Sequence, residues 1–330
     1  MNVLITGATG FIGRNLSLRL AERGHRVVAL VRRRSAGLEE KGIESRVADF
    51  EDADDMRRAI SGSEVIFHLA ALRGEWGWTA EQLKRVNVEM TGRLLDAAAA
   101  TGARQFIYCS SVSVHGRFAR KPADENYIYA PVSGYGESKV EAEKLVRSYN
   151  GQGGLATTII RPVITYGRYD FTGMVTKLIK LIHSGRYLTV GSGENTVHLA
   201  YIDDLCDGLI IAASREEAAG ETFILAGERP ITINELVSKI CSLLHKRVPK
   251  FHVPLLAAKC TGLLFEVAFR MGGRTFMKEP LITRSKVDIM TVDRAYNIEK
   301  ARSLLGYRPR IDYDEGLLRT VDWMRADCLI

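Results

Sequence analysis

Residues 2–13, with the sequence NVLITGATGFIG, decide the fold of this chain. A short apolar run comes directly before Gly7, Gly10 and Gly13, and the residues that follow carry apolar side chains at a spacing of four, which is typical of a helix packed on one face. Glycines between a strand and a helix permit a tight turn and let a phosphate group approach backbone N–H groups at the positive end of the helix. The stretch therefore predicts a strand, a phosphate-binding loop and a helix.

The rest of the first half repeats this rhythm. β-rich apolar runs at 26–31, 65–69, 106–109 and 156–160 alternate with helical stretches, which predicts a parallel sheet with crossover helices. After about Gly167 the helices lengthen, although a strand at 222–225 is expected to return to the sheet. We therefore predict an α/β fold, with a Rossmann-type doubly wound parallel sheet and a smaller, mostly helical lobe. The dinucleotide-binding domain is expected at 1–167 with a returning segment at about 197–227, and the substrate-binding lobe at 168–196 and 228–330.

Composition narrows the class of protein. The chain has 330 residues, of which 46% are hydrophobic and 26% charged, so it can bury one large core or two joined ones and is not disordered, collagen-like or coiled-coil. The net charge of +7 is a mild basic excess with one tight run, the arginines at 32–34. This pattern indicates no nucleic-acid partner and favours a small anionic ligand.

Cysteine use and hydropathy bear on the compartment. The five cysteines form no CxxC pair, which favours a reducing environment, and we expect a cytoplasmic protein. The most apolar stretch, 253–271, is interrupted by Lys259, Glu266 and Arg270, so we predict no transmembrane helix. Cys241 and His245 share a helix face, but two ligands without partners do not make a metal site, and we predict no metal.

The strongest chemical signal is the pair Tyr135 and Lys139 in YGESKVEAEKLV, where a spacing of four puts both side chains on one helix face. Hydride transfer to a ketone needs a proton donor, and the reverse reaction needs a base, for which a tyrosine with a pKa of about 10 is too weak. An ammonium about 5 Å away contributes about 3 kcal/mol at an effective dielectric constant of about 20, so we expect Lys139 to lower that pKa. Ser111 follows the strand predicted at 106–109, where its hydroxyl would orient the substrate oxygen.

The spacing Gly7-x-x-Gly10-x-x-Gly13 and the motifs that follow it resemble the extended short-chain dehydrogenase/reductase family, or NAD-dependent epimerase/dehydratase superfamily. Residues 68–71, HLAA, match its fourth-strand motif, and Asn87 begins its next helical motif. The resemblance covers nearly the whole chain. The stretch GENTVHLAYIDD at 193–204 looks most like the branch of 3β-hydroxysteroid dehydrogenases and dihydroflavonol reductases.

This resemblance implies roles for individual residues. It selects Ser111 over Ser110 or Ser113, so the implied catalytic residues are Ser111, Tyr135 and Lys139. Arg161, in the family's RP motif, is expected either near the nicotinamide amide or in a purely structural role. The implied cofactor-binding residues are Gly7, Thr9, Gly10, Phe11, Ile12, Gly13, Arg32, Arg33, Asp49, Phe50, Leu69, Ala70, Ala71, Tyr135, Lys139, Pro162 and Val163.

The residues after the second predicted strand address the choice of cofactor. In dinucleotide folds an acidic residue about 20 positions beyond the loop binds the ribose 2′-hydroxyl, whereas an arginine accommodates a 2′-phosphate. Residues 27–38 contain no Asp or Glu, and Arg32 and Arg33 follow the strand directly. We therefore predict a preference for NADP(H), with NAD(H) as the second candidate. The alternative is that these arginines only solvate a loop.

Departures from the family's motifs bear on the substrate. Sugar dehydratases carry an acidic pair beside the catalytic hydroxyl, but here Ser111 is followed by Val112 and Ser113. Ile164 and Val197 stand where nucleotide-sugar enzymes carry an asparagine and an arginine. We predict an oxidoreductase that interconverts a hydroxyl and a ketone on a hydrophobic small molecule. Ring-bearing molecules are among the candidate substrates. The alternatives are a nucleotide-sugar 4-epimerase with tightly bound NAD and a non-catalytic dinucleotide-sensing protein.

Aromatic residues occur in two loops expected on the active-site side. Trp76 and Trp78 follow the fourth strand, and Tyr127 and Tyr129 precede Tyr135. They are expected either to form an apolar wall for the substrate or to anchor the loops.

Two further expectations concern contacts with larger partners. Residues 253–271 are predicted to form a helix of the substrate lobe, with a hydrophobic substrate entrance or a peripheral membrane contact as alternatives. The resemblance also implies a homodimer formed partly by the helices after Ala80 and after Tyr135.

Overall fold

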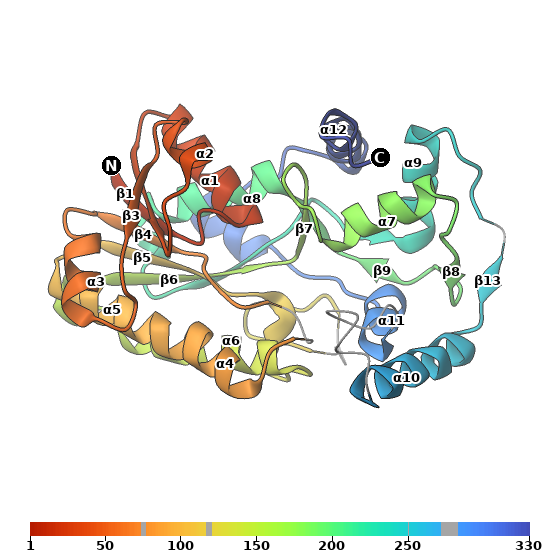
Figure 1. The fold of residues 1–330 in the computed structure, drawn as a ribbon, viewed down its shortest axis with the longest axis horizontal. Helices are drawn as coiled ribbons and strands as arrows, with labels where there is room; N and C mark the ends of the chain where they lie inside the picture. Colours follow the sequence, from red (N-terminus) through yellow and green to blue (C-terminus); the bar gives the residue numbers. More distant parts are fainter. Residues whose placement is uncertain (74–76, 117–120, 250, 272–282) are drawn as a thin grey trace.

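The computed structural model describes residues 1–73, 77–116, 121–249, 251–271 and 283–330. At its centre lies a seven-stranded sheet in which all neighbouring strands are parallel (Figure 1). The predicted α/β fold with a Rossmann-type sheet is therefore confirmed. Across the sheet the strands are β11 (Thr222–Leu225), β6 (Ala156–Pro162), β5 (Gln105–Cys109), β4 (Val65–His68), β1 (Asn2–Thr6), β2 (Arg26–Val31) and β3 (Glu44–Val47).

Helices cover both faces of the sheet, because its central strands are apolar on both sides. In β1, Val3 and Ile5 belong to one buried cluster and Leu4 to the other. The first cluster packs against α1 (Phe11–Glu22) and α8 (Ile202–Ala212), and the second against α3 (Ala53–Ile60), α5 (Met90–Ala100) and α6 (Gly134–Ser148) (Figure 1).

The two outer strands differ in how well the sequence predicts them, since β11 lies where a strand was expected and β3 does not. β3 is not among the predicted strands; it pairs with β2 alone, and its residues ESRV include two charged side chains because an edge strand is partly in contact with water. At the other edge β11 pairs with β6 in parallel, with Ile224 opposite Arg161. The chain thus returns to the sheet after about residue 220.

Within the described residues, the C-terminal half adds three small sheets and, besides α8, five further helices. The sheets pair β7 (Ile164–Tyr166) with β10 (Leu199–Tyr201), β9 (Thr196–Val197) with β12 (Ile231–Thr232), and β8 (Thr189–Val190) with β13 (His252–Val253). The helices are α7 (Met174–His183), α9 (Ile233–Leu243), α10 (Leu255–Met271), α11 (Arg284–Thr291) and α12 (Tyr313–Ala326). α10 and α11 pack together at the outer edge of the molecule, beyond the end of the large sheet (Figure 1).

Short helical turns complete the described chain. They are α2 (Ala36–Glu39), α4 (Ala80–Lys84), the π-helical turns η1 (Arg85–Glu89) and η6 (Ala301–Leu305), and the 3-10 turns η2 (Val112–Val114), η3 (Gln152–Gly154) and η4 (Glu216–Ala218). None of the described helices combines the length and the apolar character that crossing a membrane requires.

Because the strands are parallel, their carboxyl ends meet at one edge of the sheet, which is where ligands bind in open α/β sheets. The loops after β1, β2, β4, β5 and β6 all leave the sheet at this edge. They carry most of the residues that the sequence singled out.

Candidate active site

The loop between β1 and α1 depends on three glycines. Gly7 has a φ of +72°, and a Cβ on it would lie 2.7 Å from the nitrogen of Ala70. A Cβ on Gly13 would lie 2.1 Å from the carbonyl oxygen of Gly7, and the Gly10 N–H donates to that same oxygen at 2.9 Å. Larger residues at Gly7 and Gly13 would therefore force the loop away from β4 and from α1.

The first turn of α1 presents its N–H groups to the loop. Gly10 precedes the helix, and among the described residues no side chain caps this turn and no acidic side chain lies in it. Thr9 is exposed, whereas Phe11 and Ile12 are half-buried. A tight glycine cradle at an uncapped helix N-terminus fits the pyrophosphate of a dinucleotide.

A buried chain of hydrogen bonds holds the loop after β4 beside the glycine loop. The Ala70 N–H donates to Thr6 Oγ1 at 3.2 Å, and Thr6 Oγ1 lies 2.7 Å from His68 Nδ1. His68 Nε2 lies 2.8 Å from Thr91 Oγ1, whose hydroxyl donates to the carbonyl oxygen of Asn87 at 2.8 Å. Because the Thr91 proton is used, His68 donates through Nε2 and accepts from Thr6 at Nδ1. Burial lowers the pKa of His68 to about 3, so the ring stays neutral.

Asn87 continues this chain to the helix that carries Tyr135. Its Oδ1 accepts from the Leu72 N–H at 2.8 Å, and its Nδ2 donates to the Leu72 carbonyl at 3.0 Å and to Ser138 Oγ at 2.9 Å. Ser138 Oγ donates to the Tyr135 carbonyl oxygen at 2.8 Å. Sequence reasoning identified His68 and Asn87 only as parts of motifs, because their partners lie far away in the chain.

Tyr135 and Lys139 lie in the first two turns of α6, which begins after the capping side chain of Ser133. Lys139 is 2% exposed, and its Nζ donates to the carbonyl oxygen of Cys109 at 2.8 Å and to the hydroxyl oxygen of Tyr108 at 3.2 Å. The same Nζ lies 5.9 Å from the centre of the Tyr135 ring. β5 thus holds the lysine beside the tyrosine.

The serines after β5 differ in their partners. Ser111 is half-buried, and a hydrogen bond joins its side chain to that of Tyr135. Ser110 is buried and donates to Glu143 Oε1 at 2.6 Å, so its hydroxyl is already engaged. The structure therefore brings Ser111, Tyr135 and Lys139 together at the carboxyl end of β5.

The pKa of Tyr135 shifts in the direction opposite to the expectation from sequence. Burial raises it to about 12, while Arg73 and the hydrogen bond with Ser111 oppose the rise. The Lys139 ammonium, which donates to the Cys109 carbonyl, does not offset the effect of burial. Burial also lowers the pKa of Lys139 to about 8. Near pH 7 the tyrosine is therefore a neutral hydroxyl and the lysine is charged.

A buried ion pair that sequence reasoning missed lies under the site. Arg161 donates through Nε and Nη2 to the two carboxylate oxygens of Glu143 at 2.9 and 2.7 Å, and neither side chain is more than 2% exposed. Burial alone would raise the pKa of Glu143, but the hydrogen bonds and the charge of Arg161 hold it below its ordinary value. The one available signal was that Glu143 lies one turn beyond Lys139 on the same helix face. This ion pair gives Arg161 a structural role, which is one of the two roles expected for it.

The other predicted cofactor residues lie at the same edge of the sheet. Arg32 and Arg33 follow β2, are exposed, and pair with no carboxylate in the described part of the chain. Asp49 is exposed after β3. Of the remainder, Phe50, Leu69, Ala70 and Ala71 are half-buried, and Pro162 and Val163 are buried at the end of β6.

The residues expected near the substrate differ in burial and in their contacts. Val197 is completely buried in β9, and Ile164 is half-buried in β7. The Tyr129 hydroxyl donates to Glu143 at 2.6 Å, and Tyr127 stacks on His115 with 5.7 Å between ring centres, so both tyrosines anchor their loop. The indole N–H of Trp78 donates to the Arg73 carbonyl at 3.4 Å, and Trp76 lies outside the described residues.

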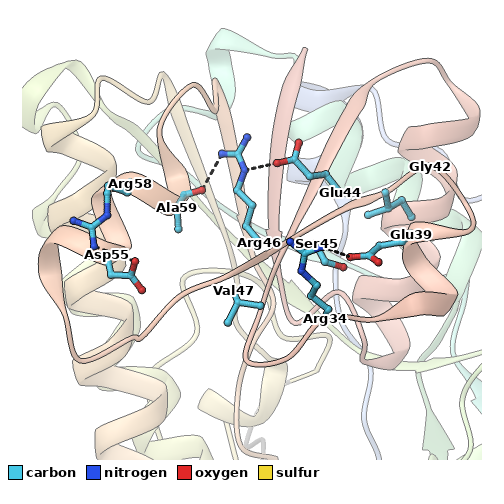
Figure 2. A pocket seen from close by; sticks show the side chains of 11 residues that line it. Arg34, Glu39, Gly42, Glu44, Ser45, Arg46, Val47, Asp55, Arg58 and Ala59 are labelled. Atoms are coloured by element: carbon cyan, nitrogen blue, oxygen red, sulfur yellow. Dashed lines mark hydrogen bonds and ion pairs between the residues drawn. The ribbon is translucent and has the colours of Figure 1, made fainter.

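A surface pocket of about 690 Å³ lies along the outer edge of β3. Figure 2 shows the side chains that line it. Arg46 donates to Glu44 at 2.7 Å and to the Ala59 carbonyl at 3.0 Å, and Arg34 lies 3.9 Å from Glu39 (Figure 2). The charged side chains that line this pocket largely neutralise one another. None of the predicted catalytic or cofactor residues lines the pocket. We therefore place the candidate site at the carboxyl edge of the sheet instead.

Comparison with known proteins identifies the family of the chain. Residues 3–226 match the model of the NAD dependent epimerase/dehydratase family. The chain is 31% identical to the 3-beta-hydroxysteroid dehydrogenase of Mycolicibacterium neoaurum, over 99% of this chain and 90% of the relative. It is 30% identical to the 2-alkyl-3-oxoalkanoate reductase of Stenotrophomonas maltophilia, over 97% and 98% of the two chains.

The fold also matches solved structures. MoeE5 in complex with UDP-glucose and NAD superimposes with a TM-score of 0.79 over 99% of this chain and all of the other, at 24% identity. At that identity the likeness concerns the fold. With a family match that covers more than half of the residues, the chain belongs to the NAD dependent epimerase/dehydratase family, whose members use a nicotinamide dinucleotide.

Proposed function

We propose that this protein is an NAD(P)-dependent oxidoreductase that interconverts a hydroxyl and a ketone on a hydrophobic, ring-bearing or alkyl-substituted small molecule. The observation that carries the proposal is the neutral Tyr135 hydroxyl, hydrogen-bonded to Ser111 and held beside the charged Lys139. A hydroxyl with a pKa of about 12 is a proton donor near neutral pH, which suits reduction of a ketone.

In this proposal each residue has a separate task. The bound nicotinamide supplies the hydride for reduction and accepts it in the reverse direction. Tyr135 donates its hydroxyl proton to the carbonyl oxygen of the substrate, and Ser111 donates a hydrogen bond to the same oxygen. Lys139 remains charged and stabilises the negative charge that develops on the tyrosine oxygen.

The hydrophobic character of the substrate rests on two positions and two relatives. Nucleotide-sugar enzymes would carry polar groups at the positions of Ile164 and Val197, and Val197 is buried among apolar side chains. The names of the curated relatives, a steroid dehydrogenase and a 2-alkyl-3-oxoalkanoate reductase, point to hydroxyl and oxo groups on apolar skeletons.

We extend the proposal to a preference for NADP(H). Arg32 and Arg33 stand exposed at the end of β2 without a carboxylate partner in the described residues, so they are available to a 2′-phosphate. Replacing both with serine should lower the affinity for NADPH about tenfold or more and leave that for NADH nearly unchanged. Equal losses for both dinucleotides, measured by fluorescence titration, would contradict this preference.

The reaction class is tested by turnover. The purified protein is first denatured to identify any released dinucleotide, and the native protein is then assayed with NADPH and cyclic ketones or 2-alkyl-3-oxoalkanoates, beside UDP-glucose. Ketone-dependent NADPH oxidation would support the proposal. Stoichiometric bound NAD with conversion of the UDP-sugar would favour a 4-epimerase, and dinucleotide binding without turnover of any substrate would favour a sensor.

A further inference from the structure

Helix α10 turns its described charges toward α11. Glu266 is 6% exposed and accepts from the N–H, Nε and Nη2 of Arg284 at 2.7, 3.0 and 2.8 Å. Lys259 pairs with Asp288 at 3.2 Å. Gly262 lets the helices approach closely, because a Cβ there would lie 2.9 Å from the nitrogen of Arg284. These ion pairs fix which face of α10 points inward.

The opposite face of α10 is apolar and exposed. Leu256, Leu264 and Met271 are 75%, 70% and 83% exposed, and Leu263 and Val267 lie between them at 43% and 46%. We call these five residues the α10 stripe. Their spacings of seven, eight, eleven and fifteen residues from Leu256 place them on one side of a helix.

The other exposed side chains that the structure describes beside the stripe are uncharged as well. The other exposed residues described between Leu256 and Met271 are Ala257, Cys260, Thr261 and Ala268. Single exposed leucines are common in soluble proteins, but a continuous apolar face along four turns of a helix marks an interaction site.

The charge of the segment that contains α10 and α11 indicates the partner. Residues 255–291 contain six Lys or Arg and three Asp or Glu, so they hold a net charge of +3 out of the chain's +7. Glu266 and Asp288 pair with Arg284 and Lys259, so these four charges cancel and the excess of +3 comes from the other charged residues of this segment. An apolar helix face on a basic segment is typical of helices that lie on anionic lipid.

We propose that the α10 stripe docks on the surface of a membrane that contains anionic phospholipid, with the helix lying in the interface. A second copy of the chain fits less well, because a two-fold contact through the stripe would bring together two copies of segment 255–291, each with a net charge of +3. α10 also does not qualify as a membrane-spanning helix. The docking does not depend on the proposed reaction.

Vesicle flotation tests the proposal on the full chain. Vesicles of phosphatidylcholine with about 30% phosphatidylglycerol should carry the protein, and pure phosphatidylcholine vesicles should carry much less. The double variant Leu256→Gln/Leu264→Gln should partition at least about tenfold more weakly, since two inserted leucines are lost. Raising the salt concentration from about 0.1 M to about 0.5 M should also weaken the binding.

A matched control replaces exposed leucines outside segment 255–291. Leu188→Gln/Leu318→Gln, at positions 53% and 45% exposed, should bind vesicles as the unsubstituted protein does. No vesicle binding, or equal binding by the α10 variant, would overturn the proposal. Binding that ignores the lipid charge would overturn its electrostatic part. A dimer in light scattering that dissociates only in the α10 variant, without vesicle binding, would assign the stripe to a second copy of the chain.

Discussion

Helices α6 and α10 both turn charged side chains inward, but they differ in what they leave outside. On α6, Lys139 and Glu143 are buried against β5 and β6, and the exposed side carries Glu137, Glu141 and Lys144. On α10 the buried acid pairs with α11, and the exposed side is the apolar stripe. Both helices thus bury charged side chains, but the exposed side of α6 is charged and that of α10 is apolar.

This difference shows what each buried charge contributes. Burying a charge is costly unless hydrogen bonds and an opposite charge compensate for it. On α6 the buried charge is Lys139, which lies beside the Tyr135 hydroxyl and can take part in the reaction. On α10 the ion pairs with α11 only orient the helix, and as a result the α10 stripe faces outward. The predictions below test the two helices against each other, beginning with the largest effect.

The largest effect should come from removing the Tyr135 hydroxyl. Tyr135→Phe should lower kcat for ketone reduction by about 10²–10⁴-fold, because the proton donor is lost, while the Kd for NADPH stays within about twofold. Tyr149→Phe, at the other end of α6, is the matched control and should retain nearly full activity. Full turnover by Tyr135→Phe in a steady-state assay would show that α6 does not supply the proton donor.

Breaking the buried ion pair of α6 should come next. Glu143→Gln should lower the free energy of unfolding by about 3–5 kcal/mol, because Arg161 is left buried without a carboxylate. The control Glu141→Gln replaces an exposed acid on the same helix and should change it by less than about 0.5 kcal/mol. Urea unfolding of both variants measures the difference. Equal stability would show that the Glu143–Arg161 pair is not needed to hold the site.

The pH dependence should report the buried lysine. Because the pKa of Lys139 is lowered to about 8, the ammonium is present below that pH and lost above it. We expect kcat/KM for reduction to fall about tenfold between pH 7 and pH 9, and Lys144→Gln, on the exposed side of α6, to leave that profile unchanged. A decline that begins only near pH 10 would mean that Lys139 titrates as an ordinary exposed lysine does.

The smallest effect should come from the α10 stripe. Leu264→Gln should change the free energy of unfolding by less than about 0.5 kcal/mol, because the side chain is 70% exposed. Ala258→Gln, on the buried side of the same helix, should destabilise the protein by about 1–3 kcal/mol through overpacking. If thermal unfolding showed equal losses in both, the stripe would be part of the core and the contrast with α6 would disappear.

Much of the fold and part of the site could be predicted from local patterns. The strand and the three glycines of residues 2–13 specify a βα unit, and the spacing of Tyr135 and Lys139 places them in adjacent turns of one helix. Edge strand β3 was missed, because its polar residues do not show the alternation of a buried strand. The direction of the Tyr135 pKa shift was also missed, because it depends mainly on how deeply the hydroxyl is buried, which the helical spacing does not show.

The order of strands and helices that predicts a parallel sheet, the phosphate loop and the helix that carries Tyr135 can all be read from the sequence, since each is indicated by apolar periodicity and turn residues within one short segment. Only the tertiary structure decided that Glu143 pairs with Arg161, that His68 links Thr6 to Thr91, and that the leucines of α10 face outward. The physical reason is the same in each case: which face of a helix is buried, and which partner a buried polar group finds, depends on elements that are distant in the chain.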